Sequence, residues 1–80
     1  YQFLAEDQTQ FLVLLRKYGS ENILCINNLS GKRENLELDL SDFKGRTLFD
    51  VNAEKDFTTI KDKPTIFSIE PFGFYWLKFV

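Results

Sequence analysis

The sequence predicts an all-β protein: an antiparallel β-sandwich of Greek-key type with about seven or eight short strands. Short apolar runs recur along the chain, and turn residues separate them at intervals of roughly eight to twelve residues. One run, residues 35–40, alternates strictly between leucine and a polar residue. No stretch sustains a 3.6-residue period between a cap and a stop signal, which disfavours helix. Eighty residues with 44% hydrophobic content are enough for one small domain, which we expect to cover 1–80.

The first expected strands are apolar on both faces. Residues 1–4 (YQFL) are a short apolar start, and residues 11–18 (FLVLLRKY) are a longer run. A buried helix is the alternative for 11–18, but the run is short and ends in Gly-Ser, so we interpret it as a strand. Residues 19–22 (GSEN) then favour a hairpin turn into the run at 23–28.

The clearest strand lies at residues 35–40, after turn residues around Gly31. Its three leucines should point into the core, and Glu37 and Asp39 should point to solvent. Residues 41–45 are expected to form a loop or a single helical turn. Further strands, separated by Asn, Asp, Lys and Pro residues, are expected at 47–51, 57–60, 65–70 and 74–80.

The last strand carries large aromatic residues on both faces. Alternation places Tyr75, Leu77 and Phe79 on one face. The opposite face then consists of Phe74, Trp76, Lys78 and Val80. One set should fill the core, and the other should meet a neighbouring domain or loop, because a monomer rarely exposes a large apolar patch. Alternatively, both faces are interior, as in a closed, barrel-like sandwich. The same two interpretations apply to residues 11–18.

Residue counts exclude several kinds of chemistry. The chain has no His and one Cys, so it cannot form a Ser-His-Asp or Cys-His catalytic site, nor a tetrahedral zinc site. Glu37 and Asp39 resemble a carboxylate pair for glycoside chemistry, but a solvated outer face is the better interpretation. We therefore predict no catalytic, cofactor-binding or metal-binding residue.

Three smaller features have structural interpretations. Cys25, within ILCI, is expected to be a buried small apolar residue rather than a reactive thiol. Asn28-Leu29-Ser30 matches the glycosylation sequon, but side-chain hydrogen bonds at a turn explain it better. The mixed-charge segment 61–63 (KDK) is expected to be solvated.

Charge and hydropathy disfavour two classes of partner. The net charge is −2 and the Lys and Arg residues are scattered, so neither nucleic acid nor an anionic membrane is an expected partner. No apolar run approaches the roughly 20 residues that span a bilayer. The first residues lack the features of a signal peptide.

Several segments together resemble a known domain. The stretch ILCINNLSGKRENLELDLSDFKGRTLFD, followed later by PFGFYWLKFV, is similar to the C-terminal β-sandwich domain of alpha-amylase family glycoside hydrolases. The trehalose synthase (maltose alpha-D-glucosyltransferase) branch is the most similar. The matching positions are Ile26–Ser30, Glu37–Leu40, Phe43, Gly45, Arg46 and Gly73–Trp76.

The resemblance implies a non-catalytic accessory domain that packs on a (β/α)₈ catalytic barrel in the same parent chain and stabilises it. The catalytic carboxylates of such barrels lie outside this domain, so no catalytic residue carries over. The parent would be a bacterial glycosidase or glucosyltransferase acting on alpha-glucosides such as maltose, trehalose or maltooligosaccharides. The branch and the unpaired Cys25 together indicate a cytoplasmic protein.

Two alternatives to a packing role remain. The domain could be a carbohydrate-binding module, in which exposed aromatic rings stack against a sugar. It could also be an unrelated β-sandwich interaction domain. Phe74, Trp76 and Tyr75 are the candidate residues for barrel packing or sugar stacking.

Overall fold

The computed structural model describes residues 2–4 and 8–80. They form antiparallel strands and one short 3₁₀ turn, which confirms the predicted all-β class. The elements are β1 (Gln2–Leu4), β2 (Phe11–Tyr18), β3 (Glu21–Asn28), β4 (Glu34–Leu38), η1 (Ser41–Phe43), β5 (Thr47–Asp50), β6 (Lys55–Thr59), β7 (Thr65–Ile69) and β8 (Phe74–Phe79).

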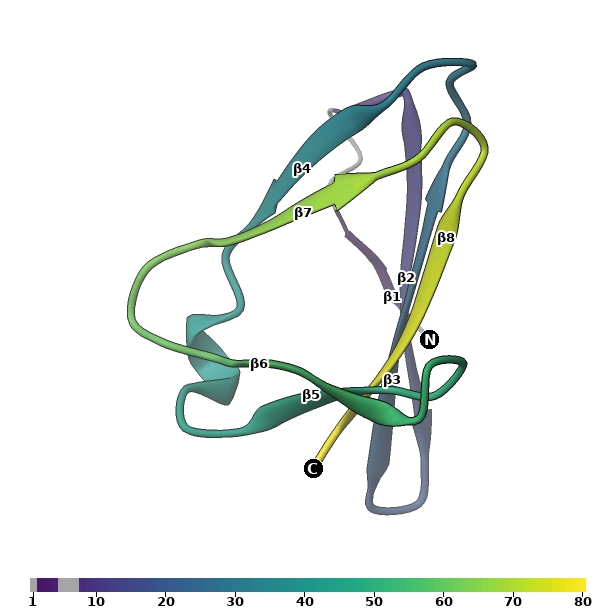
Figure 1. The fold of residues 1–80 in the computed structure, drawn as a ribbon. Coiled ribbons are helices and arrows are strands. Elements are labelled where there is room, and N and C mark those ends of the chain that lie inside the picture. Colours follow the sequence, from purple (N-terminus) through teal and green to yellow (C-terminus); the bar gives the residue numbers. More distant parts are fainter. Residues whose placement is uncertain (1, 5–7) are drawn as a thin grey trace.

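The strands form two unequal sheets. The larger has six strands in the order β1-β2-β3-β8-β5-β6, and the smaller pairs β4 with β7. In Figure 1, β4 and β7 lie to the left of β2, β3 and β8 and above β5 and β6, on one side of the larger sheet. The last strand, β8, lies between β3 and β5, which are its neighbours in space but not in sequence. A late strand thus returns from the smaller sheet to pair with an early strand of the larger one.

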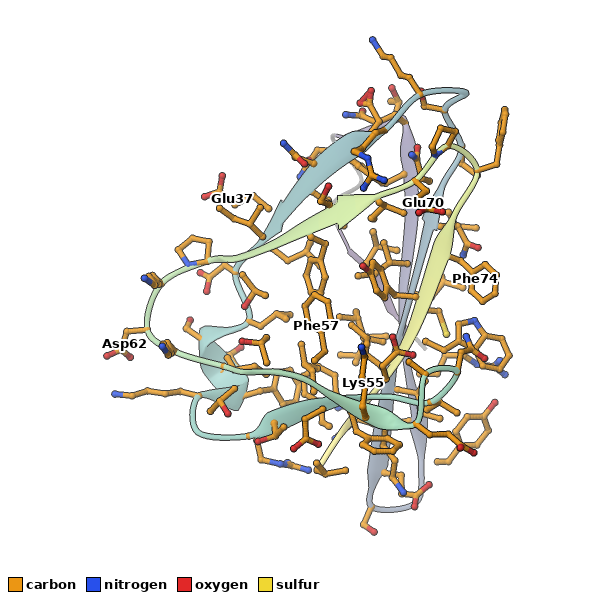
Figure 2. The ribbon with its side chains drawn as sticks, in the orientation of Figure 1. Glu37, Lys55, Phe57, Asp62, Glu70 and Phe74 are labelled. Atoms are coloured by element: carbon orange, nitrogen blue, oxygen red, sulfur yellow. The ribbon has the colours of Figure 1, made fainter. Side chains whose placement is uncertain are left out.

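The core lies between the two sheets. The leucines of the alternating run are buried as predicted, with Leu36 at 0% and Leu40 at 3% exposure, while Glu37 and Asp39 are exposed. Figure 2 shows Glu37 pointing away from the molecule. The buried apolar cluster contains Phe11, Val13, Leu15, Leu24, Ile26, Leu36, Leu38, Leu40, Leu48, Ile60, Phe67, Ile69, Leu77 and Phe79.

Some boundaries differ from the sequence prediction. The expected turn at 19–22 is tighter, because Tyr18 already pairs with Glu21 and only Gly19 and Ser20 lie between the strands. Gly19 adopts φ 59°, a conformation that glycine tolerates without steric cost. The strand expected at 57–60 begins two residues earlier, at Lys55. The turn at 41–45 does contain a single helical turn, η1.

Asn28 joins two turns at one end of the sandwich. It is 2% exposed, and its amide nitrogen donates to the carbonyl oxygens of Lys32, Ile69 and Glu70 at 2.9, 3.2 and 3.0 Å. Its side-chain oxygen accepts from the Ser30 N–H at 2.9 Å. The amide is thus buried and engaged, which confirms the turn interpretation and leaves no free nitrogen for glycosylation.

Candidate functional site

An apolar patch covers the outer face of the six-stranded sheet. Strand register aligns Leu14, Cys25 and Trp76 in one row across β2, β3 and β8. The next row contains Leu12, Asn27 and Phe74. We define the outer patch as Leu12, Leu14, Ile23, Cys25, Phe49, Phe74 and Trp76.

Phe74 and Trp76 are the most exposed residues of the outer patch. Phe74 is 56% and Trp76 47% exposed, because alternation along β8 places Leu77 and Phe79 in the core instead. Figure 2 shows Phe74 on the flank of the molecule that faces away from β4 and β7. The second face of β8 is therefore a surface of this fold rather than part of its interior.

Cys25 lies at the centre of the outer patch. It is 6% exposed, between Leu14 and Trp76 in the strand register. Burial raises the pKa of the Cys25 thiol. The positive charge of Arg16 lowers it by a smaller amount, so the net change is upward. The thiol is buried and protonated at neutral pH, as expected for an unreactive cysteine.

Charged residues border one end of the outer patch. Lys78 Nζ lies 2.8 Å from a Glu21 carboxylate oxygen, on the same face as Ile23. The Arg16 guanidinium lies 5.1 Å from the centre of the Tyr18 ring, within the range of a cation–π contact. An apolar centre with a polar border is the arrangement of many protein–protein interfaces.

Tyr75 is separated from the other two candidate residues. It lies half-buried on the inner face of β8, where its ring centre is 5.2 Å from that of Phe57 and 6.1 Å from that of Phe67. Its hydroxyl donates to the Ser68 carbonyl at 3.4 Å. Phe74 and Trp76 therefore form one surface, and Tyr75 belongs to an internal aromatic cluster.

The sequence did not indicate a cavity between β6 and β7. It has a volume of about 410 Å³. The β6–β7 pocket, as we call it, is lined by Phe57, Thr58, Thr59, Lys61, Lys63, Pro64, Thr65 and Ile66. Segment 61–63 was expected only to be solvated, and nothing local in the sequence identifies Phe57 as a pocket residue.

The part of the chain that the structure describes contains no group of three or more His, Cys, Asp or Glu side chains able to hold a metal ion. Glu37 and Asp39 are both exposed to solvent. A hydrogen bond from the Ser41 side chain lowers the pKa of Asp39, and the Ser41 backbone N–H, 3.0 Å from Asp39 Oδ1, lowers it further. Across residues 2–4 and 8–80, no helix has the length and apolar character to cross a membrane.

The two packed sheets and the one-sided outer patch define a small β-sandwich domain with an exposed apolar face. The chain belongs to the maltogenic amylase C-terminal domain family, whose model matches residues 1–76.

Curated relatives are trehalose synthases. The chain is 33% identical over 60 residues to trehalose synthase of Pimelobacter sp. (strain R48), covering 75% of this chain and 10% of that protein. It is 27% identical over 81 residues to trehalose synthase/amylase TreS of Mycobacterium tuberculosis (strain ATCC 25618 / H37Rv), covering 98% of this chain and 14% of that protein. The resemblance to the trehalose synthase branch is thus confirmed, and the chain corresponds to a small part of each relative.

A solved structure shares the fold. The crystal structure of AmyP in complex with maltose superposes with a TM-score of 0.72 at 17% identity, over 86% of this chain and 14% of that one. At this identity, the likeness concerns the fold alone.

Proposed function

We propose that residues 1–80 are the non-catalytic C-terminal domain of an alpha-amylase family enzyme, and that the outer patch packs on the enzyme's catalytic barrel and stabilises it. Membership of a C-terminal domain family and the 10% and 14% shares of the relatives' lengths support this role. By analogy with those relatives, the parent enzyme is a trehalose synthase acting on alpha-glucosides, and the unpaired Cys25 favours a cytoplasmic location.

The exposure of Phe74 and Trp76 carries the proposal. Aromatic side chains bury 150–250 Å² each, so the exposed halves of these two rings amount to roughly 200 Å² of surface. At about 25 cal/mol per Å², covering them contributes roughly 5 kcal/mol before the cost of ordering the interface. Leu12, Leu14 and Ile23 extend the same surface. A partner domain would gain stability by covering it.

The connection to the rest of a parent chain also favours this surface. A C-terminal domain is joined to its parent through its first strand. Here that strand is β1, which pairs with β2 at the edge of the six-stranded sheet. The outer patch begins on β2, so a preceding barrel would lie close to it.

The test compares matched variants in the parent enzyme. Trp76→Ser should lower the melting temperature of the parent's catalytic activity by several degrees. Leu29→Ser is the control, because Leu29 is 55% exposed but lies in the turn after β3, outside the outer patch. It should leave the melting temperature within about one degree. Equal effects of the two variants would show that the outer patch is not the interface.

A further inference from the structure

The β6–β7 pocket lies where two strand edges are open. β6 pairs only with β5 and β7 only with β4 among the described residues, so each strand has one edge without a strand partner. Backbone N–H and C=O groups on such an edge are free to bind a ligand. The loop 60–64 closes one end of the pocket, and the Ile60 N–H donates to the Arg46 carbonyl at 2.9 Å, which fixes that loop at its start.

A strand irregularity aims Phe57 into this region. Thr58 pairs with Leu48 and Asp56 with Phe49, so Phe57 is the extra residue of a β-bulge. A bulge reverses the normal alternation, and both Phe57 and Thr58 are accordingly half-buried. Bulges are over-represented next to functional sites, where they reorient a side chain.

The Phe57 ring is held in one orientation. It stacks on Phe67, with centres 5.3 Å apart and planes 16° apart, and it meets Tyr75 edge-on. It nevertheless lines the pocket. Figure 2 shows Phe57 between the layers, on the opposite side of the larger sheet from Phe74. An aromatic surface fixed in advance loses little conformational entropy when a ligand packs against it.

The walls of the pocket supply hydrogen-bond donors and acceptors. Thr58, Thr59 and Thr65 carry hydroxyl groups. Lys61 and Lys63 add ammonium donors at the rim, while the Asp62 carboxylate lies 3.0 Å from Lys44 Nζ. Figure 2 shows Asp62 pointing outward, away from Phe57. An aromatic base with a polar rim suits a pyranose ring, whose C–H face is apolar and whose hydroxyl groups project around its perimeter.

We propose that the β6–β7 pocket binds a glucosyl unit of an alpha-linked glucan, with Phe57 as the stacking surface. The choice of an alpha-glucan rests on the proposed function, whereas the site itself rests on the pocket geometry. A volume of about 410 Å³ is at the lower end of the range for small-molecule sites, the size class of a mono- or disaccharide. This site is distinct from the outer patch that contains Phe74 and Trp76.

The test is an NMR amide titration of the 80-residue chain with maltotriose, cellobiose and inorganic phosphate, each to about 20 mM, well above a dissociation constant on the order of 1 mM. Maltotriose should cause saturable shifts in residues 57–66. Phe57→Leu keeps the apolar volume but lacks the ring, and should weaken binding about fivefold. Thr65→Val, the second variant, removes a hydroxyl group of the pocket wall but leaves the aromatic cluster intact, and it should also weaken binding. Trp76→Leu should bind maltotriose as the wild type does.

Four other outcomes would overturn the proposal. Amide shifts centred on Trp76 that disappear in Trp76→Leu would place the sugar on the outer patch. Shifts with phosphate equal to those with maltotriose would show that the pocket is a simple anion site. Absence of shifts with every sugar would refute a saccharide site. A response to cellobiose alone would refute an alpha-glucan as the ligand of the pocket, without bearing on the proposed function of the parent enzyme. Barrel packing is tested separately by melting temperature.

Discussion

Asn28 offers the sharpest test of how this fold is held together. Its buried amide connects the end of β3 with the turn after it and with the β7–β8 turn, through contacts 41 and 42 residues away in sequence. Asn28→Ala removes these hydrogen bonds without adding steric strain. Because both turns depend on the same side chain, we expect the loss to destabilise the whole sandwich rather than one loop.

The magnitude follows from the geometry. The amide nitrogen has two hydrogens to share among three carbonyl oxygens, and the side-chain oxygen accepts one further bond. Three hydrogen bonds at about 1 kcal/mol each give a loss of about 3 kcal/mol. A domain of this length has a free energy of unfolding of roughly 4–12 kcal/mol. The melting temperature should fall by roughly 12–24 °C.

Urea unfolding followed by the fluorescence of Trp76, the single tryptophan, measures this loss. Asn27→Ala is the matched control, since Asn27 is the neighbouring residue on the outer face of β3, and it should cost less than about 0.5 kcal/mol. Asn28→Asp should destabilise more than Asn28→Ala as the pH rises above about 4, because the carboxylate would face the same carbonyl oxygens. A loss below about 1 kcal/mol for Asn28→Ala would refute this account of the turns.

Three further outcomes are expected. Glu54 is exposed and adopts φ 54°, a left-handed conformation that glycine tolerates better than glutamate, so Glu54→Gly should raise the free energy of unfolding by about 1 kcal/mol. Lys55→Gly is the control: Lys55 is exposed but lies in a strand, where glycine should lower the free energy of unfolding. Cys25 should react slowly with a thiol reagent even at pH 9, and Trp76→Ala should accelerate the reaction; fast modification of the wild type would contradict its burial. The lowered pKa of Asp39 stabilises the fold slightly above pH 3.8, the ordinary value, and this stability is lost as the pH falls through the pKa of the folded state. An NMR titration of Asp39 in the wild type and in Ser41→Ala measures the shift. An unchanged Asp39 pKa in Ser41→Ala would contradict the assigned cause.

Local patterns in the sequence were sufficient for the strands and their faces. Alternation at 35–40 identified the buried leucines, and alternation at 74–80 separated Leu77 and Phe79 from Phe74 and Trp76. Both predictions depend only on the two-residue period of a strand. The position of β8 between β3 and β5 required more than that period, because it depends on pairing between distant segments.

The pocket could not be predicted for the same physical reason. Phe57 faces Phe67 and Tyr75 because a bulge shifts the register between β5 and β6, and that shift is a property of the pair rather than of either strand. Asn28 was correctly interpreted as a turn residue, but two of its bonding partners, Ile69 and Glu70, lie at the end of β7 in the smaller sheet. Sequence therefore indicated the element types and left the contacts between elements open.

The two proposed surfaces are compatible because they lie on different sides of the six-stranded sheet. The outer patch faces away from the core, whereas Phe57 contacts Tyr75 on the inner face of β8. A barrel covering Phe74 and Trp76 would leave the opening between β6 and β7 unobstructed from that side, as the separation of Phe57 and Phe74 in Figure 2 indicates. One small sandwich could thus hold a catalytic domain with one face and a glucan with the other, since neither occupant displaces a residue that the other uses.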